Sequence, residues 1–277
     1  QLQERYGYLN RQCNVFPNQI LEIPGPKTIR NGKRLVVGWG GSHGHLEDMA
    51  EIAEPLSHWV TAQPDVKLHL MCSNAIWELF ARVPENKKKR TLPGSIHDYQ
   101  CFLRQIDVGI APLKSTKFNR SRSDIKFLEY ASNGVVPIVA QMEPYIESVK
   151  DGVTGLVYNN TTHLVEILDW VLKDRIRRAE ISVNAYEYVI HQRNQMEHGR
   201  ERVDFYLGLM EARGGQAPSE NWLPCWQEWT RAKGGWKRKR YLRLLDTDFE
   251  RLLYNGLVFA QQENDKQRAL EDRKSVV

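Results

Sequence analysis

Short apolar, β-branched segments alternate with helical segments along residues 34–150. The first, "RLVVGWGGSHGHLED" (34–48), passes from an apolar run through glycines into a helical pattern. The pattern recurs in "VKLHLMCSN" (66–74), "IDVGIAPL" (106–113) and "VVPIVA" (135–140), each followed by a helical segment. Strands that alternate with helices pair in parallel, because a helix is needed to carry the chain back across the sheet. We therefore expect an α/β fold: a parallel sheet with helices on both faces.

The sequence changes character after residue 160. Residues 161–212 keep only helical periodicity, and "RGGQAPSEN" (213–221) interrupts it, so a domain boundary is predicted there. Residues 213–248 are predicted to be a linker rich in tryptophan and basic residues, and 249–277 a helical extension with the spacing of the first unit of a TPR-like repeat. Because the chain lacks an initiator methionine and ends abruptly, we expect it to be a fragment.

Composition excludes several classes of protein. No stretch approaches the roughly 20 apolar residues of a membrane span, and the N-terminus lacks a signal-peptide pattern. The four cysteines, Cys13, Cys72, Cys101 and Cys225, are too scattered for a zinc site or a disulfide framework. A soluble, cytoplasmic protein is therefore expected. The net charge of +5 favours an anionic ligand, but it is too modest to indicate nucleic acid.

The glycine-rich turn after the first strand is a candidate phosphate cradle, to which we assign Gly40, Gly41, Ser42 and His43. Its spacing is neither that of a dinucleotide-binding loop nor that of a P-loop, so a plain tight connection remains an alternative. Ser42 can also cap the next helix. His43 and His45 form one HxH pair without a third ligand, so we expect no metal and assign His43 as a neutral donor to phosphate or sugar.

The stretch "SRSDIKFLEYASNGVVPIVA" (121–140) is predicted to be a helix capped by Ser123 that leads into a strand. Lys126 and Glu129 lie one turn apart, and a solvated ion pair is the simplest interpretation. However, the helix follows the carboxyl end of a strand, where ligands bind in open parallel sheets. Four basic residues precede Lys126 within a dozen positions: Lys114, Lys117, Arg120 and Arg122. This concentration of positive charge at a helix start predicts a diphosphate site.

Residues 15–212 resemble the C-terminal, nucleotide-sugar-binding domain of the family 4 (group 1) retaining glycosyltransferases of the GT-B fold. The stretches that carry the resemblance are "VFPNQI" (15–20), "VVGWGGSHGHLED" (36–48), "IDVGIAPL" (106–113) and "SDIKFLEYASNGVVPIVAQMEPYIESVKDGVTGLVY" (123–158). The resemblance implies a Rossmann-like domain over residues 19–212. It also implies that residues 1–18 are the end of an N-terminal acceptor domain and a hinge.

The resemblance implies a role for Glu129, which falls on the second glutamate of the family's paired-glutamate motif and would accept hydrogen bonds from the ribose hydroxyls. The first glutamate of that motif is replaced by Ser121, so the choice of sugar does not transfer, and Ser121 or Asn119 would act instead. The family's arginine and lysine after the glycine loop are also missing here. We predict that Lys126, Arg120 and Arg122 replace them.

The predicted catalytic residues are Lys126, Glu129 and Arg122. The predicted donor-binding residues are Gly40, Gly41, Ser42, His43, Asn119, Arg120, Ser121, Ser123 and Tyr99, the last within "PGSIHDYQ" (93–100), where base contacts are expected.

The function implied by the resemblance is transfer of a sugar from a nucleoside-diphosphate sugar, UDP rather than GDP, to a glycan, lipid or protein acceptor, without metal or a separate cofactor. The isolated chain would lack activity without an N-terminal domain. A non-hydrolysing sugar-nucleotide epimerase and a scaffold protein that uses the basic, aromatic stretch 231–243 remain alternatives. Contact with the inner face of a membrane and a protein partner for the helical tail are further expectations, and no specific nucleic acid is expected.

Overall fold

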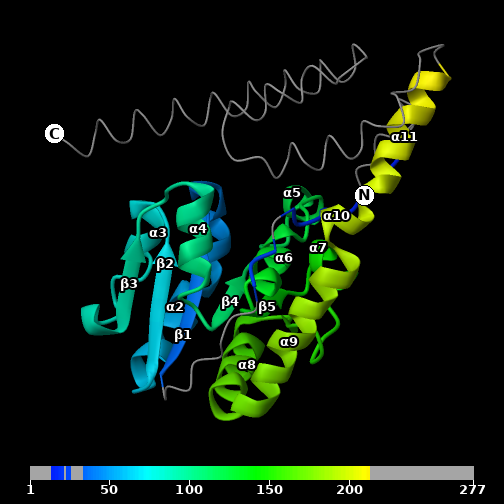
Figure 1. The fold of residues 1–277 in the computed structure, drawn as a ribbon. Coiled ribbons are helices and arrows are strands. Elements are labelled where there is room, and N and C mark those ends of the chain that lie inside the picture. The colour runs from blue at the N-terminus through cyan, green and yellow to red at the C-terminus, as the bar shows by residue number, and fades with distance from the viewer. Residues whose placement is uncertain (1–13, 22, 26–33, 213–277) are drawn as a thin grey trace, which may run out of the picture. The chain divides into compact units, whose positions relative to one another are not determined.

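The structure, a computed structural model, describes residues 14–21, 23–25 and 34–212 (Figure 1). Within these residues six strands form one sheet in the order β3-β2-β1-β4-β5-β6. The strands are β1 (Leu35–Gly40), β2 (Val66–Met71), β3 (Lys88–Thr91), β4 (Val108–Ala111), β5 (Val136–Ala140) and β6 (Leu156–Tyr158). Every pairing in the sheet is parallel. The expected parallel α/β fold is therefore confirmed.

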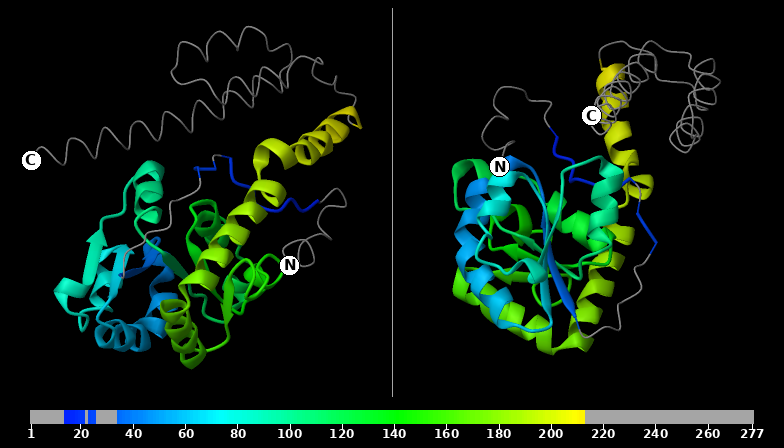
Figure 2. Two further views of the ribbon diagram at one scale, coloured as in Figure 1. Left: turned by 60° about the horizontal axis from the view of Figure 1, so that its bottom comes forward. Right: turned by 90° about the vertical axis from the view of Figure 1, so that its left-hand side faces the viewer.

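The helical elements are η2 (His43–His45), α2 (Leu46–Ala62), α3 (Asn74–Glu78), η3 (Glu85–Lys87), α4 (Ile96–Leu103), α5 (Lys117–Arg120), α6 (Ile125–Ser132), α7 (Glu143–Ile146), α8 (Thr161–Lys173), α9 (Arg175–Gln192), α10 (Gln195–His198) and α11 (Arg200–Glu211). Crossover connections between parallel strands are right-handed, so the reversal of strand order at β1 sends helices to opposite faces. Accordingly, α2 covers one face of the sheet and α4 the other (Figure 2).

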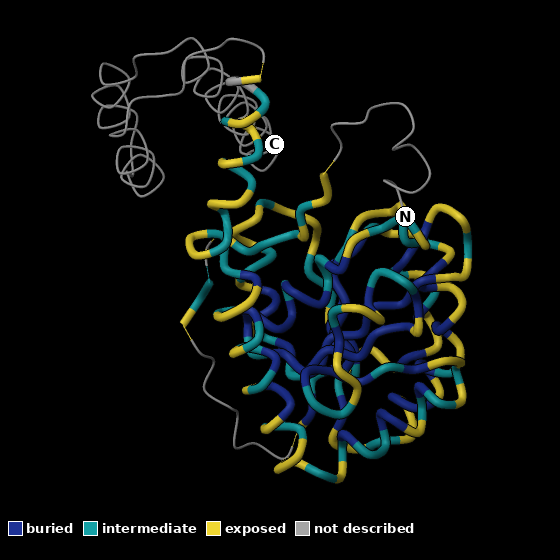
Figure 3. The backbone as a smooth tube through the Cα atoms, turned by 90° about the vertical axis from the view of Figure 1, so that its right-hand side faces the viewer, coloured by how far each residue is buried: buried dark blue, intermediate teal, exposed yellow. Residues whose placement is uncertain are grey.

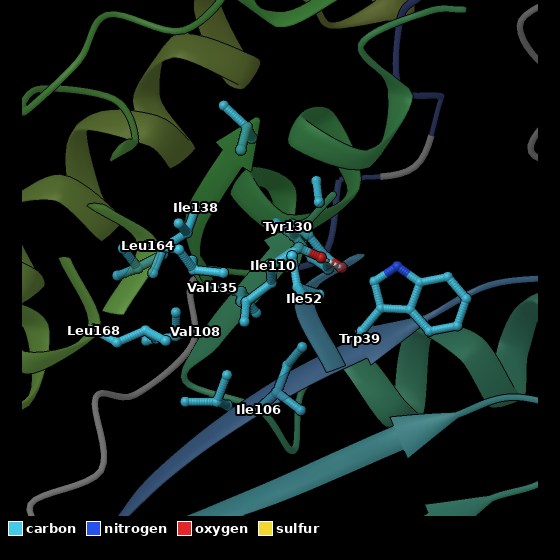
Figure 4. Packing of buried hydrophobic residues seen from close by; sticks show 14 of the residues in the cluster. Trp39, Ile52, Ile106, Val108, Ile110, Tyr130, Val135, Ile138, Leu164 and Leu168 are labelled. Carbon is cyan, nitrogen blue, oxygen red and sulfur yellow. Dashed lines mark hydrogen bonds between the residues drawn. The ribbon is translucent and has the colours of Figure 1, made fainter. Parts of the chain in front are cut away.

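The core lies between the sheet and its helices, where the backbone is almost continuously buried (Figure 3). Trp39, Ile52, Ile110 and Tyr130 meet at its centre, and the Tyr130 hydroxyl donates to the Ile110 carbonyl at 2.9 Å (Figure 4). Gly109 is required opposite Tyr130, because a Cβ there would lie 2.6 Å from the ring. Each fully buried large side chain contributes about 1.5–3 kcal/mol. Helix α6, which carries Lys126 and Glu129, is thus fixed closely against β4.

Strand β3 was not predicted from the sequence, because its residues, "KKRT", are not apolar. The structure buries the Lys88 side chain to 3% exposure, with Nζ 2.9 Å from Glu85 and 4.6 Å from the centre of the Trp77 ring. A lysine satisfied in this way occupies a core position that the pattern of apolar residues does not reveal.

The chain divides into two compact units, residues 1–199 and 200–277. Of the second unit the structure describes α11 and the residue after it. Within α11, Arg200 and Asp204 form an ion pair at 2.7 Å. The predicted segments 213–248 and 249–277 lie outside the described residues, as do the basic stretch 231–243 and most of the predicted segment 1–18. The predicted boundaries of the α/β domain at residues 19 and 212 stay predictions.

Candidate functional site

A cavity of about 350 Å³ lies where the carboxyl ends of β1 and β4 diverge. It is lined by His43, Gly44, Leu46, Glu47, Asp48, Lys114, Thr116, Phe118, Asn119 and Arg122. The order of the sheet reverses between these two strands, and the crevice outside such a reversal is where doubly wound sheets bind ligands. The fold thus brings together His43, Asn119 and Arg122 from the predicted set.

Asp48 organises this cavity, although its side chain is almost fully buried. Its carboxylate accepts hydrogen bonds from His45 Nδ1 at 2.8 Å, from the Lys114 backbone amide at 2.8 Å and from Asn119 Nδ2 at 2.7 Å. Burial raises the pKa of Asp48, but these hydrogen bonds outweigh it and hold the pKa below its ordinary value. Asp48 is therefore ionised and can only accept, so His45 Nδ1 donates the hydrogen bond that joins the two side chains.

Arg122 is fixed by two acceptors that are not carboxylates. Its Nε donates to Asn119 Oδ1 at 2.9 Å and its Nη1 donates to His45 Nε2 at 2.9 Å, while the guanidinium carbon lies 4.9 Å from the centre of the Phe118 ring. The side chains of both acceptors, His45 and Asn119, also donate a hydrogen bond to Asp48. No carboxylate within the part of the chain that the structure describes pairs with this guanidinium. Arg122 thus brings to the cavity a positive charge that no carboxylate of the described residues contacts directly, while ionised Asp48 lines the same cavity.

The other predicted cations differ from Arg122 in this respect. Lys114 pairs with Glu47 at 3.2 Å, Arg120 pairs with Glu143 on α7, and Lys126 pairs with Glu129. Lys114 and Arg122 line one cavity, and the predicted convergence of all the cations on a diphosphate stays a prediction.

Glu129, Lys126 and Tyr99 form a second, partly buried cluster. Glu129 Oε2 accepts from the Tyr99 hydroxyl at 2.8 Å and from Lys126 Nζ at 3.1 Å, and Lys126 also donates to the Tyr99 oxygen at 2.8 Å. Burial, followed by the nearby Glu129 charge, raises the pKa of Tyr99 well above its ordinary value, so the phenol keeps its proton. Glu129 Oε1 has no hydrogen-bond partner among the described residues. Tyr99 thus positions Glu129, and its expected contact with a base stays a prediction.

The predicted glycines serve packing. A Cβ on Gly40 would lie 2.8 Å from the Tyr99 ring, and one on Gly41 would lie 2.6 Å from the Trp39 ring. The Gly41 amide donates to the Met71 carbonyl and is thus engaged within the sheet. Among the predicted serines, Ser42 precedes η2 without a side-chain capping bond, Ser121 Oγ reaches the Lys117 carbonyl at 3.5 Å, and Ser123 is exposed.

The start of α6 differs from the prediction. Its N-cap residue is Asp124 rather than Ser123, and the Asp124 side chain makes no capping bond. Instead, the Asp124 carboxylate pairs with Arg193 at 2.7 Å and accepts from the Ser148 hydroxyl at 2.6 Å. A buried ion pair therefore anchors the helix that carries Glu129.

The residues that the structure describes contain no group of three His, Cys, Asp or Glu side chains arranged to hold a metal ion. None of their helices combines the length and apolar character needed to cross a membrane.

The strand order and the switch-point cavity define a doubly wound, Rossmann-like domain. No family model and no curated protein matches the sequence. Solved structures of GT-B glycosyltransferases are similar in fold. HepE of Anabaena in complex with UDP and glucose has a TM-score of 0.53 at 16% identity, over 62% of this chain and 48% of that one. A mutant of S. aureus TarM with fondaparinux, α-GlcNAc-glycerol and UDP has a TM-score of 0.56 at 12% identity, over 67% and 38%.

A glycosyltransferase from Rickettsia africae has a TM-score of 0.53 at 16% identity, over 65% of this chain and 48% of that one. The chain thus spans less than half the length of these structures. At such identities the comparison establishes the fold alone, and any activity has to be argued from the residues of the site.

Proposed function

We propose that this chain is the donor-binding half of a retaining glycosyltransferase that uses a UDP-sugar. The observation that carries the proposal is the guanidinium of Arg122, which is held at the switch-point cavity without a carboxylate partner. The diphosphate of a nucleotide sugar would be the direct anionic partner of this guanidinium. The similarity in fold to HepE, solved with UDP and glucose, supports a uridine nucleotide.

Glu129 is proposed to hold the ribose. Its Oε1 is available to a hydroxyl, while Tyr99 and Lys126 fix its Oε2. A carboxylate oriented in this way accepts strong, charge-assisted hydrogen bonds. Asn119 and Ser121, in place of a second glutamate, are proposed to face the sugar.

The chemistry follows from the charge that develops as the bond between the anomeric carbon and the diphosphate breaks. Negative charge grows on the leaving phosphate, and a preorganised cation such as Arg122 lowers the barrier by stabilising it. Because arginine can supply this charge, we propose that transfer needs no metal ion. The acceptor is proposed to be a glycan, lipid or protein, and the chain by itself is proposed to bind donor without transferring sugar, because it spans less than half the length of the similar glycosyltransferases. A cytoplasmic location, with contact at the inner face of a membrane, fits such a donor.

Calorimetric titration of the chain with UDP-glucose in the presence of EDTA tests the proposal. Binding is expected in wild type, with a loss of about 10- to 100-fold in Arg122→Gln, the range for a hydrogen-bonded charged group. Arg82→Gln is the matched control, because Arg82 forms an exposed ion pair with Glu54 on another surface. Equal loss in both variants, or binding only with a divalent cation, would contradict the proposal.

A product assay separates transfer from the epimerase alternative. The full-length protein is incubated with the nucleotide sugar, with and without acceptor. Release of UDP that depends on acceptor supports transfer, whereas an isomerised nucleotide sugar without acceptor indicates an epimerase.

A further inference from the structure

Asp48, His45 and Arg122 form a relay of hydrogen bonds behind the cavity. His45 Nδ1 donates to Asp48 at 2.8 Å, and His45 Nε2 accepts from Arg122 at 2.9 Å. The His45 side chain is 12% exposed and its ring packs edge-on against Trp39. A proton on Nε2 would set an N–H group against the Arg122 N–H, so the relay keeps His45 neutral while Arg122 stays in place.

The cavity has less positive charge than a diphosphate requires. Lys114 and Arg122 are the basic residues that line it, and Lys114 is half exposed and paired with Glu47. Glu47 and Asp48 also line the cavity, so Arg122 is the lining cation that no carboxylate of the described residues contacts, and it would face the two negative charges of a nucleotide sugar's diphosphate. Its Nη2 has no partner among the described residues, so the guanidinium can turn toward an anion while Nε stays on Asn119.

Building on the proposed function, we infer that His45 is the second cation of this site and gains its charge only when the anion binds. As Arg122 Nη1 moves from His45 to a phosphate oxygen, Nε2 loses its donor. One proton from solvent then binds Nε2, and ionised Asp48 stabilises the imidazolium through Nδ1. No bond between heavy atoms changes, and the proton returns to solvent when the anion leaves.

The charged and titratable groups near His45 are His43 in η2, Glu47 and Asp48 in α2, Lys114 after β4 and Arg122 before α6, and Tyr145 in α7 lies near Arg122 and Asp48. Burial raises the pKa of Tyr145, so that phenol stays neutral. Both carboxylates favour a protonated His45, and Lys114 is compensated by Glu47. Arg122 is the group in contact with the ring that opposes protonation, so its movement toward the anion changes the balance.

Proton uptake makes affinity depend on pH. The protonated form must bind the anion more tightly, so affinity is expected to rise as pH falls across the histidine range of about 8 to 5. An upward shift of one unit in the His45 titration midpoint corresponds to about tenfold in affinity.

The test is an NMR titration of the histidine rings in the full chain with pH, alone, with sulfate and with UDP-glucose. Both ligands keep a constant charge in this range, so any linkage reports on the protein. Calorimetry in two buffers of different ionisation enthalpy then counts the protons taken up. We expect the His45 midpoint to rise with either ligand and close to one proton to be bound. His45→Gln, which keeps an acceptor for Arg122, should bind UDP-glucose with little pH dependence, whereas the exposed His58→Gln should behave as wild type.

The outcomes distinguish the two proposals. A rise with sulfate but no binding of UDP-glucose would leave the proton-linked anion site standing and refute the donor assignment. Binding of UDP-glucose with an unchanged His45 midpoint would refute the inference and leave the proposed function intact. No response to either ligand would refute both. The wild-type titrations decide even if the His45 variant does not fold, because the ring signals can be assigned through the backbone.

Discussion

Replacement of Glu129 by glutamine tests whether this residue holds a ribose or only supports α6. The Lys126–Glu129 pair is 3.1 Å long, with side chains 15% and 22% exposed, so it is better shielded than a surface pair. Glutamine loses the charge but keeps an oxygen for the Tyr99 hydroxyl, and we expect a stability loss of about 1 kcal/mol. If Glu129 accepts ribose hydroxyls, UDP-glucose should bind about 5- to 150-fold more weakly, which corresponds to about 1–3 kcal/mol.

The assay combines denaturant unfolding, which measures the stability loss, with calorimetric binding. Glu180→Gln is the matched control, because Arg177 and Glu180 form a pair with the same i,i+3 spacing on α9, 2.8 Å long and half exposed. That variant should bind UDP-glucose as wild type does. A 2′,3′-dideoxy analogue should bind wild type poorly and lose little more in Glu129→Gln. Equal losses for the ribose and dideoxy ligands would show that Glu129 does not contact the ribose and would refute this assignment.

Three further predictions concern buried groups. Asp124→Ala leaves the Arg193 guanidinium unpaired at 8% exposure and should cost about 3–5 kcal/mol in denaturant unfolding; a loss below 1 kcal/mol would argue against the anchor. Burial raises the pKa of the Cys72 thiol to about 11, so alkylation of the native chain, mapped by peptide mass, should modify exposed Cys101 first, and equal rates would contradict this. The pKa of Asp48 is lowered on folding, so its stabilisation is complete above its ordinary value of 3.8 and is lost as pH falls through the lower folded value. Asp48→Asn should lack that component of acid unfolding, and an unchanged pH profile would exclude it.

Much of the fold was predictable because its signals are local. The apolar runs that became β1, β2, β4 and β5 each lie within a few residues, and burial on both faces keeps them apolar. Strand β3 was not predicted, since Lys88 is buried through contacts with Trp77 and Glu85 that a pattern of apolar residues does not report.

The candidate site was predictable where one helix carried the residues. Lys126 and Glu129 share α6, and their pairing follows from their spacing. Asp48 and the partners of His45 were not predicted, because Asp48 meets the Lys114 amide and His45 meets Arg122 across distant parts of the chain. An acidic residue in the first turn of a helix has an ordinary explanation in the helix dipole, which hid the role of Asp48.

The central place of β1 also bears on how the chain folds during translation. On one edge of β1, Leu35 pairs with Val66 of β2, and on the other edge Val37 pairs with Val108 of β4. The pairing with β4 therefore forms only after much more of the chain has left the ribosome. Pairings so distant in sequence form slowly, and an unpaired strand edge exposed in the interval favours association with other chains. The cavity, which lies between the ends of these two strands, is complete only when β4 and the residues after it, up to Arg122, have joined β1. A ligand can therefore slow the unfolding of the finished sheet, but it cannot guide the earlier pairing of β1 with β2.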